Sequence, residues 1–199
     1  MLDEPFRRWM ASTASAPARW MQRAGVSPNT VTVAGFALSV AGTWPIATGR
    51  PVLGIALWLL GRLLDGYDGL LARLSGRTSL FGGFLDITLD MLAYSAMAVA
   101  FAWAMPMDRW LWMLVLVGYV MAITTTLALS SLLERADQQL GGNRSLQFTP
   151  GRAEGGETTI VYCLLALLPD ASRWLLSAFI VLLLLTVVAR LRLAARLLR

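Results

Sequence analysis

Six apolar segments separated by short polar turns constrain the fold of this chain more than any other feature. An α-helix needs about 20 apolar residues to cross the hydrocarbon core of a bilayer. Hydrophobic residues make up 57% of the chain and the mean hydropathy is +0.62, both above the values of a soluble globular domain. The sequence therefore predicts an all-α, polytopic membrane protein with six transmembrane helices. Their expected ranges are 30–48, 52–74, 80–104, 110–133, 158–168 (starting about a turn earlier) and 174–191.

The arginines predict how these segments are oriented in the membrane. All 17 basic residues are arginine, and only Arg50, Arg109 and Arg173 fall in the turns on one side. The others fall at helix ends, loops and tails of the opposite side, apart from Arg62 in the middle of a segment. Cytoplasmic loops of membrane proteins are enriched in arginine. We therefore expect both termini on the cytoplasmic side, of the cell inner membrane if the protein is bacterial.

Residues 1–27 do not resemble a cleavable signal, because they have no continuous apolar core. Bulky apolar residues such as Phe6, Trp9 and Trp20 alternate with arginines in this stretch. The pattern predicts an N-terminal amphipathic helix that lies in the membrane interface, and a disordered basic tail is the alternative. The expected organisation is a juxtamembrane segment over 1–27 followed by one transmembrane domain over 28–199.

The composition excludes several kinds of function. The single cysteine, Cys163, lies in an apolar run, which excludes a disulfide framework and a zinc site built from thiolates. The chain has no histidine, so any general base must be a carboxylate. The net charge of +5 comes from arginines at segment ends. Membrane topology and anionic lipid explain that charge, so no nucleic-acid partner is expected.

Four aspartates stand inside or beside the second and third apolar segments. Asp65 and Asp68 share one face of a helix, and Asp86 and Asp90, four residues apart, share a face of the next helix. A short turn between the helices would bring the two faces together, so that the four carboxylates converge. Structural salt bridges with the two nearby arginines are the alternative, but two arginines cannot neutralise four aspartates. The pattern instead favours a site for hard divalent cations suited to phosphoryl transfer.

These residues carry a resemblance to a known family. The pattern D-x2-D-G-x2-A-R-x8-G-x3-D-x3-D, which runs from Asp65 to Asp90, is similar to the signature of the CDP-alcohol phosphatidyltransferases, and all eight fixed positions are filled. The helix count and the element Pro28-Asn29-x-x-Thr32 extend the resemblance more loosely over most of the chain. The resemblance implies a membrane enzyme of phospholipid biosynthesis. Such an enzyme transfers a phosphatidyl group from CDP-diacylglycerol to the hydroxyl of a small alcohol, releases CMP and forms a homodimer.

The resemblance also implies roles for individual residues. One or two divalent cations, Mg2+ or Mn2+, would be held by the signature aspartates, namely Asp65, Asp68, Asp86 and Asp90. Asp90 would in addition accept the proton of the acceptor hydroxyl, which makes it the implied catalytic residue. The CDP donor would bind the other signature positions and the start of the first helix, namely Gly69, Ala72, Arg73, Gly82, Asn29 and Thr32. For Asn29, helix capping is the alternative explanation.

A second polar cluster precedes the fifth apolar segment and comprises Arg144, Arg152, Glu154 and Glu157. It either forms a loop and helix cap or shapes the pocket for the acceptor alcohol. Together with Arg77, its arginines favour a phosphorylated or anionic acceptor, and the expected product is of the phosphatidylglycerophosphate type.

Two alternative functions remain. One is transfer of a CDP-linked headgroup to a lipid alcohol, and the other is a non-catalytic cation-binding scaffold or transporter. The apolar outer halves of the segments count against a transport pathway.

Overall fold

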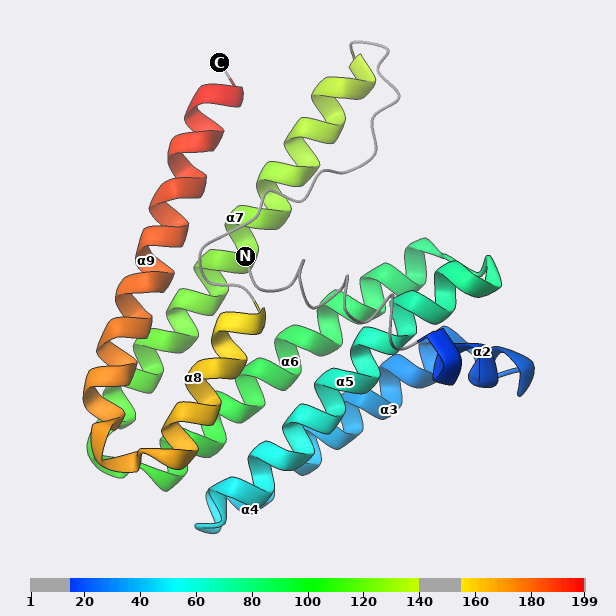
Figure 1. Cartoon of the computed structure of the whole chain (residues 1–199). Coiled ribbons are helices and arrows are strands. Elements are labelled where there is room, and N and C mark those ends of the chain that lie inside the picture. Colours follow the sequence, from blue (N-terminus) through cyan, green and yellow to red (C-terminus); the bar gives the residue numbers. More distant parts are fainter. Residues whose placement is uncertain (1–14, 140–154, 199) are drawn as a thin grey trace.

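Helices make up the described structure, and their order follows the apolar segments of the sequence. The computed structural model describes residues 15–139 and 155–198, and within these ranges it contains no β-strand. Figure 1 shows α3, α5 and α6 on one side of the bundle and the pair α7 and α9 on the other, with α8 between them. The helices are α2 (Ser15–Arg23), α3 (Pro28–Ala41), α4 (Thr43–Ala47), α5 (Pro51–Ser75), α6 (Leu80–Ala104), α7 (Arg109–Gln139), α8 (Gly155–Leu167) and α9 (Ser172–Leu197), with short 3-10 turns η1 (Pro106–Asp108) and η2 (Pro169–Ala171).

The prediction of an all-α protein that crosses the membrane several times is confirmed. By length and composition, the stretches of the described chain that could cross a membrane are Pro28–Ala47, Leu80–Ala104, Pro106–Arg135 and Pro169–Leu197. Two further helices were expected to span. α5 is 25 residues long but carries an arginine and two aspartates in its second half, and α8 is a shorter apolar helix of 13 residues. The count of six spans therefore stays a prediction.

Some helix boundaries differ from the expected ones. The first segment was predicted as one helix over 30–48, but α3 ends at Ala41 and α4 begins at Thr43. Pro45 explains the break, because a proline has no N–H to donate to the carbonyl of residue 41 and its ring crowds that carbonyl. The fourth segment was predicted over 110–133, and α7 continues beyond it through Gln139.

Glycines set how closely α3 and α5 approach each other. A Cβ atom at Gly35 would lie 2.9 Å from the carbonyl oxygen of Gly61, and one at Gly42 would lie 2.6 Å from the carbonyl oxygen of Gly54. No side chain fits at these two crossings, so the backbones pack directly, as small residues allow in membrane helices. This contact fixes the start of α3 against the second half of α5, which carries the aspartates (Figure 1).

Aromatic side chains fill the centre of the bundle. Trp58, Phe101, Trp112 and Tyr162 have no more than trace exposure, and they come from α5, α6, α7 and α8. Phe101 stacks on Trp112 with 5.3 Å between ring centroids, while Trp58 meets Tyr162 edge to face at 5.5 Å. Such pairs stabilise a core beyond the burial of their area. Trp58 anchors α5 in this aromatic centre, and the aspartates follow it on the same helix.

Exposed tryptophans mark the end of the bundle opposite to the aspartates. Trp44 at α4, Trp103 near the end of α6, Trp110 at the start of α7 and Trp174 at the start of α9 are 57–79% exposed. Tryptophan is enriched where membrane proteins meet the water–lipid interface, because its ring is apolar and its N–H is polar. The four residues therefore indicate the level at which this end of the bundle meets one face of the bilayer.

A closed polar cluster joins α7 and α9 at the same end. Asp108, 6% exposed, accepts a hydrogen bond from the Ser172 hydroxyl at 2.6 Å and one from Nε of Arg173 at 3.2 Å. The three residues, called here the Asp108 cluster, tie η1 to the first turn of α9. Its negative charge is matched by one positive charge.

Candidate metal centre and nucleotide cleft

A tight turn places the aspartates of α5 opposite those of α6. Gly76 ends α5 with φ of 64°, a left-handed conformation that glycine adopts without strain. The Ser79 hydroxyl then caps α6 by accepting a hydrogen bond from the Gly82 N–H at 2.9 Å. The short turn predicted between the two helices is thus confirmed, and it makes α5 and α6 an antiparallel pair (Figure 1).

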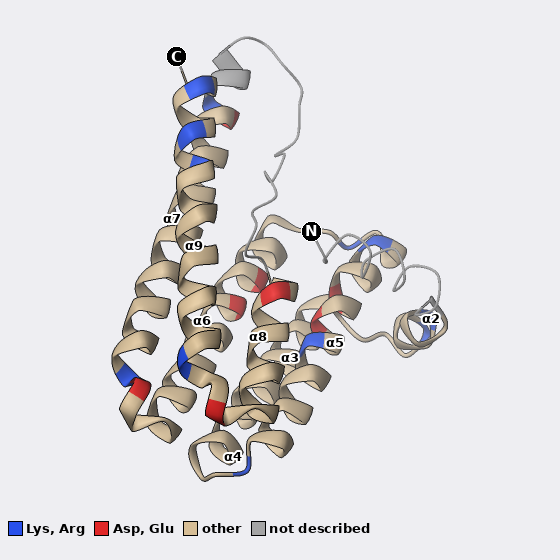
Figure 2. Ribbon diagram, turned by 60° about the vertical axis from the view of Figure 1, so that its left-hand side comes forward, with Lys and Arg blue, Asp and Glu red and all other residues tan. Residues whose placement is uncertain are grey.

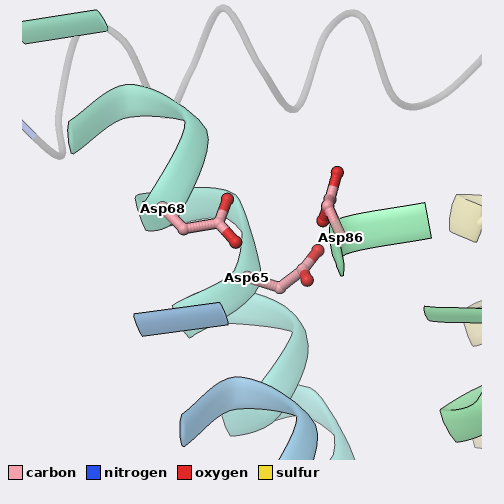
Figure 3. A group of neighbouring side chains, drawn as sticks. All are labelled: Asp65, Asp68 and Asp86. Atoms are coloured by element: carbon pink, nitrogen blue, oxygen red, sulfur yellow. The ribbon is translucent and has the colours of Figure 1, made fainter. Parts of the chain in front are cut away.

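Three of the four signature aspartates converge. One carboxylate oxygen from each of Asp65, Asp68 and Asp86 lies within 4.8 Å of the other two. Figure 3 shows the Asp65 and Asp68 side chains projecting from α5 and Asp86 reaching toward them from α6. An all-oxygen set of carboxylates is what Mg2+ and Mn2+ prefer, and like charges so close together need a cation to offset their repulsion. These three residues, called here the aspartate cluster, fit a divalent metal ion.

Asp90 lies beside the aspartate cluster but is engaged by an arginine. Nη2 of Arg62 donates a hydrogen bond to Oδ1 of Asp90 at 2.7 Å and also lies 3.3 Å from Oδ1 of Asp65. Arg62, the one arginine in the middle of a predicted segment, therefore pairs with carboxylates of both helices. The expected convergence of four carboxylates becomes three plus one, with Arg62 between the cluster and the fourth.

A cleft of about 230 Å3 opens beside the aspartate cluster. Every residue that the sequence assigned to the CDP donor lines this cleft, together with two of the aspartates: Asn29, Thr32, Gly69, Ala72, Arg73, Gly82, Asp68 and Asp86. Arg77 and Ser79 from the turn after α5 line it too, and neither was assigned to the donor from the sequence. The signature and the start of α3 therefore form one surface.

The start of α3 contributes two polar side chains to this surface. The Thr32 hydroxyl donates a hydrogen bond to Oδ2 of Asp68 at 2.5 Å, which orients one member of the aspartate cluster. The cap of α3 is Ser27, whose hydroxyl accepts from the Thr30 N–H at 3.1 Å. Asn29 is therefore not the capping residue, and its Oδ1 lies 3.2 Å from where a Cβ of Gly82 would be. The Asn29 side chain therefore extends across the cleft toward Gly82 of α6.

Arg73 and the signature glycines complete the wall of the cleft. Nη1 of Arg73 lies 3.4 Å from where a Cβ of Gly69 would be, so the guanidinium lies along the side-chain-free face of α5. A guanidinium beside bare backbone can donate a fork of hydrogen bonds to a phosphate. The surface thus combines carboxylates for a cation with donors for phosphate oxygens.

The residues expected to bind the acceptor fall mostly outside the described structure. Arg144, Arg152 and Glu154 lie in the stretch 140–154. Glu157 is described and stands, half-buried, in the first turn of α8. A Cβ at Gly155 would lie 2.6 Å from the Tyr94 hydroxyl. Because Tyr94 follows Asp90 by one helical turn, the start of α8 lies close to the fourth aspartate.

Tyr94 is a site residue that the sequence reasoning missed. It continues the stripe of Gly82, Asp86 and Asp90 with the same spacing of four, so one more step along the helix face would have found it. Its ring lies 5.2 Å from the Arg62 guanidinium carbon, and its hydroxyl is 3.5 Å from Nη1 of that arginine.

Comparison with known proteins agrees with this geometry. The family model of the CDP-alcohol phosphatidyltransferases matches residues 25–190. Inner membrane protein YnjF of Escherichia coli is 32% identical over 85% of this chain and 83% of its own, and an archaetidylinositol phosphate synthase of Pyrococcus horikoshii is 31% identical over 69% and 67%.

Among solved structures, the Mycobacterium tuberculosis phosphatidylinositol phosphate synthase with CDP-DAG bound has a TM-score of 0.71 at 25% identity, covering 92% of this chain and 94% of its own. The same synthase in complex with manganese and citrate has a TM-score of 0.69 at 26% identity, over 90% and 87%. The signature, the fold and the matched residues lead to one conclusion: this chain belongs to the CDP-alcohol phosphatidyltransferase family.

Proposed function

We propose that this protein transfers a phosphatidyl group from CDP-diacylglycerol to the hydroxyl of a small phosphorylated alcohol and releases CMP. The observation that carries the proposal is the convergence of Asp65, Asp68 and Asp86 beside a cleft lined by all the donor-binding residues of the signature. The solved relative with CDP-DAG bound supports the choice of donor.

The aspartate cluster would hold one or two divalent cations, with Mg2+ and Mn2+ both suited to its oxygens. A bound cation would neutralise charge on the pyrophosphate and on the departing phosphate. Thr32 orients Asp68 for this task through its hydrogen bond. Manganese in a solved structure of the relative supports the assignment.

The chain's other residues bind the donor and move a proton. Gly69 and Gly82 let the nucleotide approach the backbone, and Arg73 donates to a phosphate oxygen. Asp90 accepts the proton of the acceptor hydroxyl while the hydroxyl oxygen forms a bond to the lipid-side phosphorus. The bond from that phosphorus to the bridging oxygen breaks, its electron pair stays with CMP, and the products are a phosphodiester lipid and CMP.

A phosphorylated polyol is the acceptor that we propose. Two relatives are named as inositol phosphate synthases, one of archaetidyl and one of phosphatidyl lipids. Glycerol phosphate, our expectation from the arginines, has the same chemistry of a hydroxyl beside a phosphate. The start of α8 with Glu157, and Arg144, Arg152 and Glu154 of the neighbouring stretch, are proposed to bind it.

The membrane arrangement that we propose has six spans, with α5 and α8 crossing alongside the four apolar stretches. The exposed tryptophans would mark the outer interface, and the aspartate end would face the cytoplasm, where CDP donors and phosphorylated alcohols are dissolved. Arginines at the ends of α5 and α9 support this orientation, among them Arg73, Arg77, Arg192 and Arg196. Figure 2 shows basic segments at the C-terminal end of α9. Residues 28–199 would form the catalytic domain of a homodimer, and 1–27 an interfacial segment to which α2 belongs.

The proposal is tested by CMP release from the purified protein in mixed micelles. CDP-diacylglycerol and Mn2+ or Mg2+ would be supplied with inositol phosphate, glycerol phosphate, inositol, glycerol and serine in separate reactions, with Asp90→Asn as the control. We expect release that requires a cation, one phosphorylated acceptor and Asp90. Release with none of the acceptors would contradict the proposal. Release only from a CDP-linked headgroup and a lipid alcohol would replace the donor and acceptor assigned here.

A further inference from the structure

Arg62 is a partly buried cation that lies between the aspartate cluster and Asp90 and forms no part of the family signature. Its side chain is 13% exposed, and one nitrogen, Nη2, contacts both Asp90 at 2.7 Å and Asp65 at 3.3 Å. Charged side chains are rare inside membrane segments and usually have a function. Arg62 therefore needs a role of its own.

Two aromatic rings fix the guanidinium of Arg62. Its central carbon lies 5.2 Å from the centroid of Trp58 and 5.2 Å from that of Tyr94. Trp58 has 0% exposure and Tyr94 5%, so neither ring can move without disturbing the core. The two centroids are 5.0 Å apart, so both rings flank the same side of the guanidinium, and contact with both stabilises the cation and limits its freedom. The position of Nη2, and with it that of the Asp90 carboxylate, is therefore set by the core.

The position of Arg62 divides the carboxylates into two groups. Asp65, Asp68 and Asp86 have ligand oxygens within 4.8 Å of one another, whereas Asp90 is bonded to the arginine. A positive charge 3.3 Å from Asp65 also opposes a second cation near the same carboxylate. Arg62 thus keeps Asp90 beside the cluster and weakens the cluster's attraction for metal.

We propose that Arg62 is a positioning residue that reserves Asp90 for proton transfer and keeps it from serving as a further metal ligand. The proposal rests on the proposed function. Asp90 is held through Oδ1, so that its other oxygen can take the proton of the acceptor. The hydroxyl of Tyr94 contacts both Arg62 and the start of α8, where the acceptor is proposed to bind. Arg62 therefore connects Asp90 with Tyr94, which lies against the start of α8.

The test is Arg62→Gln, measured in two ways that should change in opposite directions. We expect kcat for CMP release to fall by about 10- to 100-fold, because the base is no longer held in place, while KM for CDP-diacylglycerol stays within about threefold. Mn2+ alone, titrated in micelles and followed by electron paramagnetic resonance, should bind roughly three- to tenfold more tightly, because an opposing charge is gone. Arg62→Met keeps the packing on Trp58 and Tyr94 and carries the same two expectations.

Two controls separate this role from a structural one. Arg62→Lys restores the positive charge and should recover most of kcat and the Mn2+ affinity of the unchanged protein. Arg173→Gln removes an arginine paired with an aspartate at the opposite end of the bundle and should alter neither quantity.

A kcat for R62Q or R62M within twofold of the unchanged protein would overturn the inference, as would a parallel loss of activity and Mn2+ binding. If the unchanged protein released no CMP with any acceptor, the proposed function would be what failed. The Mn2+ titration would still decide whether Arg62 opposes cation binding, and an unchanged affinity would refute that.

Discussion

Two groups of charged residues lie at opposite ends of the bundle, and they differ in whether their charges are matched. The Asp108 cluster has one carboxylate, to which one arginine and one hydroxyl both donate hydrogen bonds. The aspartate cluster has three carboxylates, and the nearest cation, Arg62, is shared with Asp90. Figure 2 shows one set of acidic segments at the lower ends of α7 and α9 and another well separated from it.

This difference indicates that the Asp108 cluster stabilises the fold, whereas the aspartate cluster is suited to binding a cation. Buried charges are tolerated when each is paired and hydrogen-bonded, which describes Asp108. The aspartate cluster leaves net negative charge beside a cleft, which lowers the stability of the metal-free protein but creates affinity for a cation. We therefore expect substitutions in the first group to change folding and substitutions in the second to change activity.

Asp68→Asn is expected to give the largest effect. It removes the negative charge of one of three cation ligands and replaces the carboxylate that accepts the Thr32 hydrogen bond with a neutral amide, while preserving shape. CMP release should fall by on the order of a hundredfold or more. The thermal midpoint measured without metal should stay the same or rise, because a like-charge repulsion is relieved. A lower midpoint together with retained activity would reverse the roles of the two groups.

Asp108→Ala is expected to have the opposite profile. It leaves the Ser172 hydroxyl and the Arg173 guanidinium without their partner, at a cost of about 1–3 kcal/mol in the free energy of unfolding. Activity per folded molecule should stay within about twofold at low temperature. Unfolding would be followed in micelles by thermal denaturation. A large drop in kcat without loss of stability would break the comparison.

Thr32→Val tests how far the aspartate cluster depends on its neighbours. The substitution is nearly isosteric and removes the only atom of this side chain that donates to Asp68. Hydrogen bonds to charged groups contribute about 1.5–3 kcal/mol, so kcat/KM should fall by roughly tenfold or more. The effect should remain smaller than that of Asp68→Asn when the two are assayed side by side.

Arg173→Gln should have the smallest effect. The Arg173 side chain is 61% exposed, and exposed ion pairs contribute only about 0–1 kcal/mol. We expect the free energy of unfolding to change by a few tenths of a kcal/mol and CMP release to remain unchanged. A loss as large as that of Asp108→Ala would show that the ion pair, and not the buried Ser172 hydrogen bond, holds the cluster together.

The sequence predicted which residues share a helix face, but it predicted neither the break in the first helix nor the position of Asp90. The spacings from Gly69 to Asp90 predicted which residues would meet, because a helix face follows directly from residue numbers. The break before Pro45 was missed although its cause is local and visible in the sequence. The position of Asp90 could not be predicted, since it depends on the register between α5 and α6 and on the rings that hold Arg62.

The measurement that tests this account most directly is Mn2+ binding to the purified protein, followed by electron paramagnetic resonance in micelles. Asp65→Asn, Asp68→Asn and Asp86→Asn would each be compared with Asp108→Asn as the matched control. The account predicts binding by the unchanged protein, weakened by at least tenfold in each of the first three variants and unchanged in the fourth. Equal Mn2+ affinity in all four variants would contradict the assignment of the aspartate cluster as the metal site.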